Sequence, residues 1–71
     1  MLKCHLSRLM GERRLKISGV SRDTEINRGT VTRLYHDTYT RIEKDTINTL
    51  CDYFDCRIEE LFEFTPEDKK E

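Results

Sequence analysis

The sequence predicts an all-α domain, a compact bundle of five short helices. Apolar residues recur at helical spacing from one end of the chain to the other, and no segment shows the sustained alternation of a strand. The only proline, Pro66, follows the last apolar group, so it interrupts no helix. A chain of 71 residues, 35% of them hydrophobic, supports one core. We therefore expect one domain over residues 1–65 and a disordered, charged tail over residues 66–71.

Two helices are expected in the first third of the chain. The first runs to about residue 14, and its apolar positions i, i+4, i+7 and i+8 are Leu2, Leu6, Leu9 and Met10. The second is shorter, and its positions i, i+3 and i+7 are Ile17, Val20 and Thr24. Its start is open, because Lys16 is a poor cap whereas Ser18 would cap better but shorten the helix.

A third helix is expected over residues 27–35, with one apolar and one polar side. Asn27 is a favoured N-cap residue type and opens the segment. The apolar side is formed by Val31, Leu34 and Tyr35. The opposite side is small, polar and basic, and consists of Arg28, Gly29, Thr32 and Arg33.

Two further helices complete the bundle. Residues 40–43 match the Ser/Thr-x-x-Glu capping box and are expected to start the fourth helix. Its apolar face is formed by Ile47, Leu50, Cys51 and Phe54. The last helix is short and carries Ile58, Leu61 and Phe62. The least regular connection spans residues 35–39.

The charged residues are distributed unevenly. Residues 1–41 hold nine Lys or Arg against four Asp or Glu, a net charge of +5, whereas residues 42–71 hold four against ten, a net charge of −6. Such a chain can present its basic half to phosphates and turn its acidic half away. Ordinary solvated charge would give the same composition, so charge alone does not identify a partner.

The most informative segment is residues 17–34, where two short helices meet at a tight turn near residues 25–26. The major groove of B-DNA admits a helix, whose exposed N-terminal residues reach the base edges. Arg28 and Arg33 suit guanine or phosphate, and Thr32 offers a hydroxyl or a methyl group. An αα-hairpin with a solvated basic face is the alternative interpretation of the same pattern.

Two segments carry a resemblance to a known family. Residues 20–34 read VSRDTEINRGTVTRL, similar without gaps to the pattern Leu-Ala-x-x-x-Gly-Ile-Ser-x-x-Thr-Val/Leu-Ser-x-Leu. Residues 45–56, DTINTLCDYFDC, and residues 60–64, ELFEF, resemble the ending Asp-Thr-Leu-x-x-Leu-Cys-x-x-Leu-x-Cys…Asp-Leu-Leu-x-Tyr. With these segments, residues 6–64 resemble the Cro/cI-type (XRE-like) helix-turn-helix family, especially its short single-domain members.

The resemblance implies a lambda-repressor-like five-helix bundle, with the helix-turn-helix at helices 2 and 3. It implies a sequence-specific transcriptional regulator of bacterial or phage type, a repressor, working in the cytoplasm without a cofactor. The third helix, about residues 27–35, would read the major groove of double-stranded DNA, and a homodimer would bind a palindromic operator.

Three sets of site residues are expected. The expected base contacts are Asn27, Arg28, Gly29, Thr32 and Arg33. The expected phosphate contacts are Lys16, Ile17, Arg22, Thr30, Tyr39 and Arg41. The expected dimer interface consists of Phe62, Phe64 and Thr65.

Three positions depart from the family pattern. Ser21 stands in place of a small alanine. Glu25 stands in place of the turn glycine, at a position that usually needs φ > 0, which glutamate adopts only at a cost. Ile17 stands in place of a frequent glutamine, and its side chain cannot hydrogen-bond a phosphate. These departures affect the turn and the contacts of the second helix more than the fold.

Other function classes find little support in the sequence. The cysteines, Cys4, Cys51 and Cys56, lack the paired spacing of a zinc site, so no metal is expected. Their odd number fits a reducing cytosol, and no segment has the roughly 20 apolar residues of a membrane span. His5 and His36 have no placed catalytic partner, so no enzyme is expected. The remaining alternative is a protein-interaction module or antitoxin component that keeps the helix-turn-helix shape.

Overall fold

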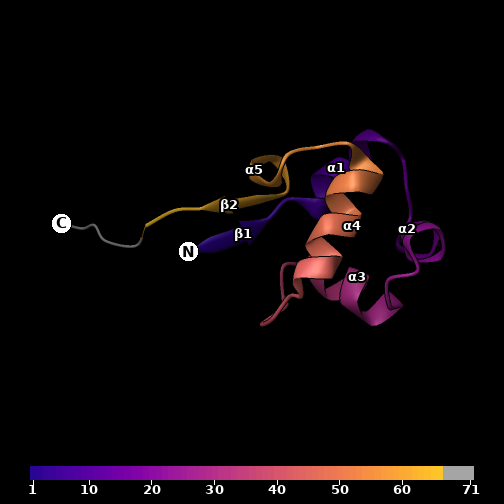
Figure 1. The fold of residues 1–71 in the computed structure, drawn as a ribbon, viewed down its shortest axis with the longest axis horizontal. Coiled ribbons are helices and arrows are strands. Elements are labelled where there is room, and N and C mark those ends of the chain that lie inside the picture. The colour runs from indigo at the N-terminus through magenta and orange to yellow at the C-terminus, as the bar shows by residue number, and fades with distance from the viewer. Residues whose placement is uncertain (67–71) are drawn as a thin grey trace.

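A computed structural model describes residues 1–66, which form five helices and a short two-stranded sheet (Figure 1). The elements in chain order are β1 (Leu2–Cys4), α1 (Leu6–Glu12), α2 (Ile17–Thr24), α3 (Arg28–Tyr35), α4 (Lys44–Phe54), α5 (Ile58–Leu61) and β2 (Phe62–Phe64). The predicted helical bundle is confirmed, with the small sheet added to it. Of the tail expected to be disordered, residues 67–71 lie outside the described residues.

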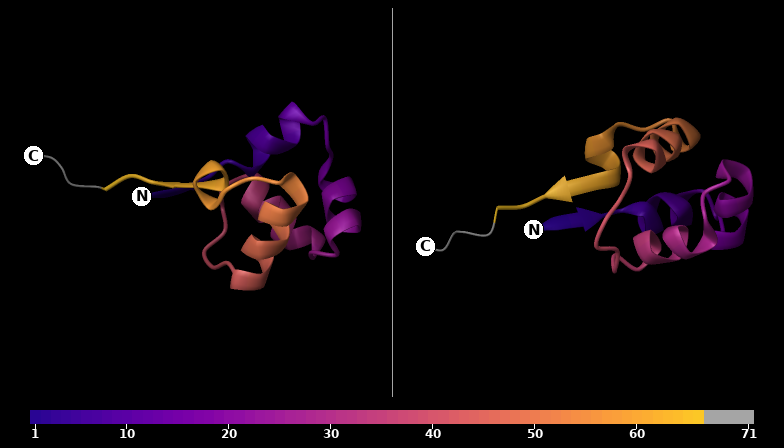
Figure 2. Two further views of the ribbon diagram at one scale, coloured as in Figure 1. Left: turned by 45° about the horizontal axis from the view of Figure 1, so that its top comes forward. Right: turned by 60° about the horizontal axis from the view of Figure 1, so that its bottom comes forward.

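The sheet corrects the prediction at both ends of the chain. β1 pairs antiparallel with β2, so that Leu2 lies opposite Phe64 and Cys4 lies opposite Phe62. The first helix therefore begins at Leu6 rather than Leu2, and Phe62 opens a strand rather than ending the last helix. Three-residue strands are too short to show a period, and their pairing joins segments that are distant in sequence. The two paired strands, called the β1–β2 ribbon below, project away from the helices, as Figure 2 shows.

The helix starts show which local signals determine the structure. α2 begins at Ile17, and neither Lys16 nor any other side chain caps it, which resolves the open start. The expected capping box at residues 40–43 does not form, because α4 begins at Lys44. Its N-cap residue is Glu43, whose side chain makes no capping hydrogen bond. Residues 40–43 remain in the loop, where Ile42 packs against the core.

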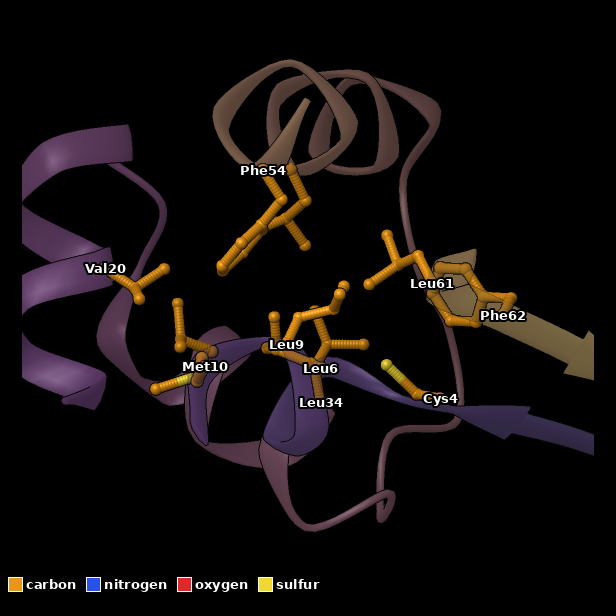
Figure 3. Close-up of a cluster of buried hydrophobic side chains, with 11 residues drawn as sticks. Cys4, Leu6, Leu9, Met10, Val20, Leu34, Phe54, Leu61 and Phe62 are labelled. Atoms are coloured by element: carbon orange, nitrogen blue, oxygen red, sulfur yellow. The ribbon is translucent and has the colours of Figure 1, made fainter. Parts of the chain in front are cut away.

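One apolar core joins all the elements (Figure 3). Its buried side chains are Cys4, Leu6, Leu9, Met10, Val20, Val31, Leu34, Leu50, Phe54, Leu61 and Phe62. Phe54, at the end of α4, is fully buried, and the guanidinium of Arg13 lies 5.3 Å from its ring centroid. The same guanidinium donates a 2.5 Å hydrogen bond to the Phe54 carbonyl. Arg13 thus ties the segment after α1 to the C-terminus of α4, where a positive charge is favourable.

The turn between α2 and α3 is built without glycine. Glu25 adopts the left-handed conformation, with φ of 63°, as expected from its position in the pattern. The Ser21 hydroxyl donates a 2.6 Å hydrogen bond to the Ile26 carbonyl. The Thr24 hydroxyl donates to the Val20 carbonyl at 2.7 Å and accepts the Ile26 N–H at 3.3 Å. These side chains hold the backbone on both sides of the strained residue.

We expect Glu25→Gly to stabilise the fold. Glycine removes the steric cost of the left-handed conformation, roughly 1 kcal/mol, and the entropy that glycine loses on folding offsets part of this gain. The net effect should raise the melting temperature by up to about 4–8 °C, the range per kcal/mol for a domain of this size. Thermal unfolding followed by circular dichroism measures it.

Ser18→Gly is the matched control, because Ser18 is an exposed residue in the first turn of α2, where φ is not positive. Glycine there should lower the melting temperature slightly, because glycine is a poorer helix former than serine. A lower melting temperature for Glu25→Gly as well would contradict the assignment of strain to residue 25.

Candidate nucleic-acid interface

The two sides of α3 have different environments, as the sequence predicts. Val31 and Leu34 are buried in the core. Asn27, Arg28 and Arg33 are exposed, and the small residues between them are half-buried. α3 therefore presents a short polar and basic surface outward while its apolar side holds it to the body.

The N-terminus of α3 is held by the predicted cap. The Asn27 side-chain carbonyl accepts the Gly29 N–H at 2.8 Å, which satisfies one of the unpaired amides at the helix start. A Cβ added at Gly29 would lie 3.0 Å from Asn27 Oδ1 and 3.3 Å from Arg33 Nη1. Glycine at this position thus leaves room for the cap and for the Arg33 side chain. Its expected close approach to DNA stays a prediction.

The polar side chains of α3 differ in how they are engaged. The Thr32 hydroxyl donates to the Arg28 carbonyl at 2.8 Å, an i to i−4 bond within the helix. Arg33 Nη2 lies 3.4 Å from the Thr30 hydroxyl oxygen. Within residues 1–66, no hydrogen bond or ion pair engages the Arg28 guanidinium. Arg28 is therefore available to an external acceptor without first losing an internal partner.

Two other helices begin with open N-termini near exposed lysines. No side chain caps α2 or α4, so their first amides have no side-chain acceptor. Lys16 precedes α2, and Lys44 is the first residue of α4. Helix N-termini favour anions, whereas a cation in the first turn opposes the helix dipole. Lys44 was not among the site residues predicted from the sequence, and two acidic residues, Glu43 and Asp45, flank it.

A groove of about 570 Å³ lies between α3 and the start of α4. Five residues expected at the interface line it together, namely Asn27, Thr30, Arg33, Tyr39 and Arg41. Thr46 and Thr49 of α4 line it as well and were not predicted, because the sequence places them on a different helix. Three carboxylates, from Glu25, Glu43 and Asp45, line the same groove and offset the two arginines.

Tyr39 does not fit the expected phosphate contact. Its hydroxyl is buried and has no hydrogen-bond partner among residues 1–66, and burial raises its pKa. Its ring packs edge-to-face on Phe62, with centroids 6.0 Å apart. The Tyr39 hydroxyl is therefore not turned toward a phosphate in this arrangement, although the residue itself lines the groove between α3 and α4.

Arg22 belongs to a network that joins α2 to α4. Its Nε lies 3.2 Å from Asp23 Oδ1, and the Tyr53 hydroxyl donates to Asp23 Oδ2 at 2.7 Å. The hydrogen bond from Tyr53, and secondly that from Arg22, hold the pKa of Asp23 below its usual value. The expected phosphate contact of Arg22 would compete with this internal ion pair.

Phe62 also differs from its expected place at an exposed dimer interface. It is 8% exposed and belongs to the core, whereas Phe64 is 68% exposed. Because neighbours on a strand face opposite sides, Phe62 and Phe64 share one face of β2. The inner residue of that face is covered by the protein itself, and the outer one is not.

Comparison with known families identifies the domain that this geometry forms. Residues 5–67 match the family described as the Cro/C1-type HTH DNA-binding domain. The chain belongs to the Cro/C1-type family. This confirms the resemblance carried by residues 20–34 and 45–64 and identifies α2, the turn and α3 as the helix-turn-helix of a DNA-binding domain. No curated protein matches the chain closely enough to narrow the function further.

Residues 1–66 contain no group of three or more His, Cys, Asp or Glu side chains arranged to hold a metal ion. Over the same residues, none of the helices has both the length and the apolar character needed to cross a membrane.

We expect Asn27→Ala to destabilise the Cro/C1-type domain by about 1 kcal/mol, within the range of about 0.5–2 kcal/mol measured for lost caps. The substitution leaves the Gly29 N–H without its acceptor at the start of α3. Urea unfolding at constant m-value measures the loss. Asn27→Asp is the control and should keep most of the stability, because aspartate is an equally good cap. Equal destabilisation by both variants would contradict a capping role.

Proposed function

We propose that this protein is a sequence-specific transcriptional regulator, a repressor of bacterial or phage type, that reads the major groove with α3. The observation that carries the proposal is the unengaged Arg28 guanidinium on the outer side of a capped helix within a Cro/C1-type domain. An exposed arginine at the start of a recognition helix has the reach and geometry to bind guanine through two hydrogen bonds.

The proposed base contacts come from one side of α3. Arg28 binds a guanine, and Thr32 places its methyl group against a thymine while its hydroxyl stays on the Arg28 carbonyl. Asn27 and Arg33 contact neighbouring base edges at the ends of this surface. Gly29 contributes by leaving the helix surface low between them, so that the DNA can approach.

The proposed phosphate contacts surround α3. Lys16 and the backbone N–H of Ile17 lie at the open N-terminus of α2. Thr30 and Arg41 lie along the groove between α3 and α4. We add Lys44, at the open N-terminus of α4. Arg22 would join this set only after leaving Asp23, and Tyr39 is removed from it because its hydroxyl is buried.

The proposed activity is binding rather than catalysis and needs no cofactor. The +5 charge of residues 1–41 supports attraction to a polyanion. A regulator of bacterial or phage type acts where its operator is, so we place it in the cytoplasm.

We also propose that the working form is a homodimer on a palindromic operator, joined through the β1–β2 ribbon. Leu2 and Phe64 lie opposite each other and are 47% and 68% exposed. They continue the apolar face whose inner pair, Cys4 and Phe62, is buried in the core. A second copy would cover this exposed apolar pair through one two-fold axis.

The acidic residues of the groove favour a second candidate, a protein-interaction module or an antitoxin component. Glu25, Glu43 and Asp45 stand beside α3, where they would repel phosphates but attract a basic partner. An autoregulatory antitoxin would bind both DNA and protein. This candidate would be favoured if the native protein showed no sequence preference in the experiment below and bound a basic protein instead.

We expect Arg28→Ala to weaken binding to the preferred operator by about 1–3 kcal/mol and to relax the preference at one base pair. The operator is first selected from a random DNA pool, and the affinity is then measured for every single-base variant. Lys16→Ala, a change at a proposed phosphate contact, should weaken all sequences uniformly and reduce the salt slope by about 1.

Arg57→Ala is the matched control, because Arg57 is exposed at the start of α5 and pairs with the exposed Glu59. It should leave the operator affinity unchanged. If Arg28→Ala weakens every sequence to the same extent, the proposed base contact is wrong.

We expect Phe64→Ala to shift the dimer toward monomer and to weaken binding to the full palindrome more than to a half-site. The change removes the most exposed aromatic ring of the ribbon without touching α3. Sedimentation with and without the operator measures it, with half-site centres about 34 Å apart, one turn of DNA. Ile58→Ala, which truncates an apolar residue on α5 that is 51% exposed, is the control. A native protein that stays monomeric and binds a half-site as tightly as the palindrome contradicts the proposal.

A further inference from the structure

The C-terminus of α4 forms a turn that brings two cysteines together. Asp55 adopts the left-handed conformation, with φ of 51°. Its N–H donates to the Asp52 carbonyl at 3.2 Å, and the Cys56 N–H donates to the Cys51 carbonyl at 3.0 Å. This pair of hydrogen bonds is the Schellman motif, which is frequently accompanied by a contact between the side chains at the positions of Cys51 and Cys56. The position usually filled by two apolar residues is filled here by two thiols.

The backbone geometry suits a bond between these thiols. With standard bond lengths, the 3.0 Å N–H to carbonyl contact limits the Cα–Cα separation of Cys51 and Cys56 to about 7 Å. Disulfides usually span Cα–Cα separations of about 4.4–6.8 Å. The turn therefore keeps the two Cα atoms within or just beyond the upper end of the disulfide range, without any change in the course of the backbone.

The environment separates this pair from the third cysteine. All three thiols are free, and Cys51 and Cys56 are half-buried, so both remain open to solvent. Burial, and then the neighbouring Cys51 thiol, raise the pKa of Cys56. Cys4 is only 6% exposed, and burial raises its pKa to about 11. Because the thiolate is the reactive form and must be reached by the reagent, Cys4 is protected in the folded protein.

We propose that Cys51 and Cys56 form a dithiol site that low-molecular-weight disulfides oxidise to an intramolecular disulfide. The thiolate of one cysteine attacks a sulfur of the reagent, whose disulfide bond breaks to release one thiol and leave a mixed disulfide. The thiolate of the second cysteine attacks the protein sulfur of that mixed disulfide and releases the second thiol. The two cysteines lose two electrons and two protons, which leave in the two released thiols.

The disulfide would link Cys51 in α4 to Cys56 in the loop between α4 and α5. The same C-terminus holds the Phe54 carbonyl bound by Arg13, so the linked turn borders the centre of the core. The inference depends on this turn and not on the proposed DNA binding. A reversible modification here would stabilise the α4–α5 junction against local opening without altering any residue of α3.

The test treats the full, native chain with oxidised glutathione and follows intact mass and the number of free thiols. The native protein should lose two of its three thiols without retaining glutathione, and peptide mapping should locate a Cys51–Cys56 link. Cys51→Ser and Cys56→Ser should each keep one glutathione, because the resolving thiol is missing. Cys4→Ser is the matched control and should form the same link as the native protein.

Three results would overturn the inference. The native protein could retain glutathione on Cys51 or Cys56, which would show that the second attack does not occur. Cys4 could react as fast as the pair, which would show that the chain reacts after unfolding. Disulfide-linked dimers could form in place of the internal link. Mapping of the native protein decides between these results even if a serine variant folds poorly.

Discussion

Every helix and both strands contribute at least one side chain to the same apolar core, and the position of α3 depends on that core. α2 is attached through Val20, and α3 through Val31 and Leu34. A domain of this size buries only about 60% of the surface of its unfolded chain, so few contacts are redundant. Phe54 carries the largest fully buried side chain, and Arg13 holds its ring and its carbonyl. The rigidity of the outer side of α3 therefore depends on a small number of buried residues.

The helix-turn-helix shows how two departures from a pattern compensate each other. Glu25 occupies a left-handed position that favours glycine and carries a steric cost. Ser21, which stands where the family has a small alanine, supplies a hydrogen bond to the Ile26 carbonyl that alanine could not make. Thr24 adds two more hydrogen bonds at the same turn. The turn keeps its shape because neighbouring side chains hold the backbone on both sides of the strained residue.

The side chains around α3 carry charges of both signs, although the net charge of residues 1–41 is +5. Arg28 is unengaged within the described chain, but Arg22 is paired with Asp23, and the groove beside α3 carries three carboxylates. In the proposed complex, attraction to a phosphate backbone would come from Lys16 and the open N-terminus of α2 as much as from net charge, because Glu43 and Asp45 flank Lys44 at the start of α4. Mixed charges of this kind would restrict the orientations in which the domain can meet a phosphate backbone in that complex.

The sequence by itself determined the features that depend on local physics. Helical periodicity located α2, α3 and the apolar face of α4, and the cap at Asn27 follows from its residue type. The left-handed conformation of Glu25 was implied by its place in the family pattern, against the preference of glutamate. Only the tertiary structure decided the features that join distant segments. The pairing of β1 with β2, the burial of Tyr39 against Phe62 and the groove between α3 and α4 each need two parts of the chain to meet. The capping-box pattern at residues 40–43 failed for the same reason, because the packing of Ile42 holds that segment in the loop. Local hydrogen bonds and periodicity act over one or two helical turns, whereas these features depend on which surfaces the folded core brings into contact.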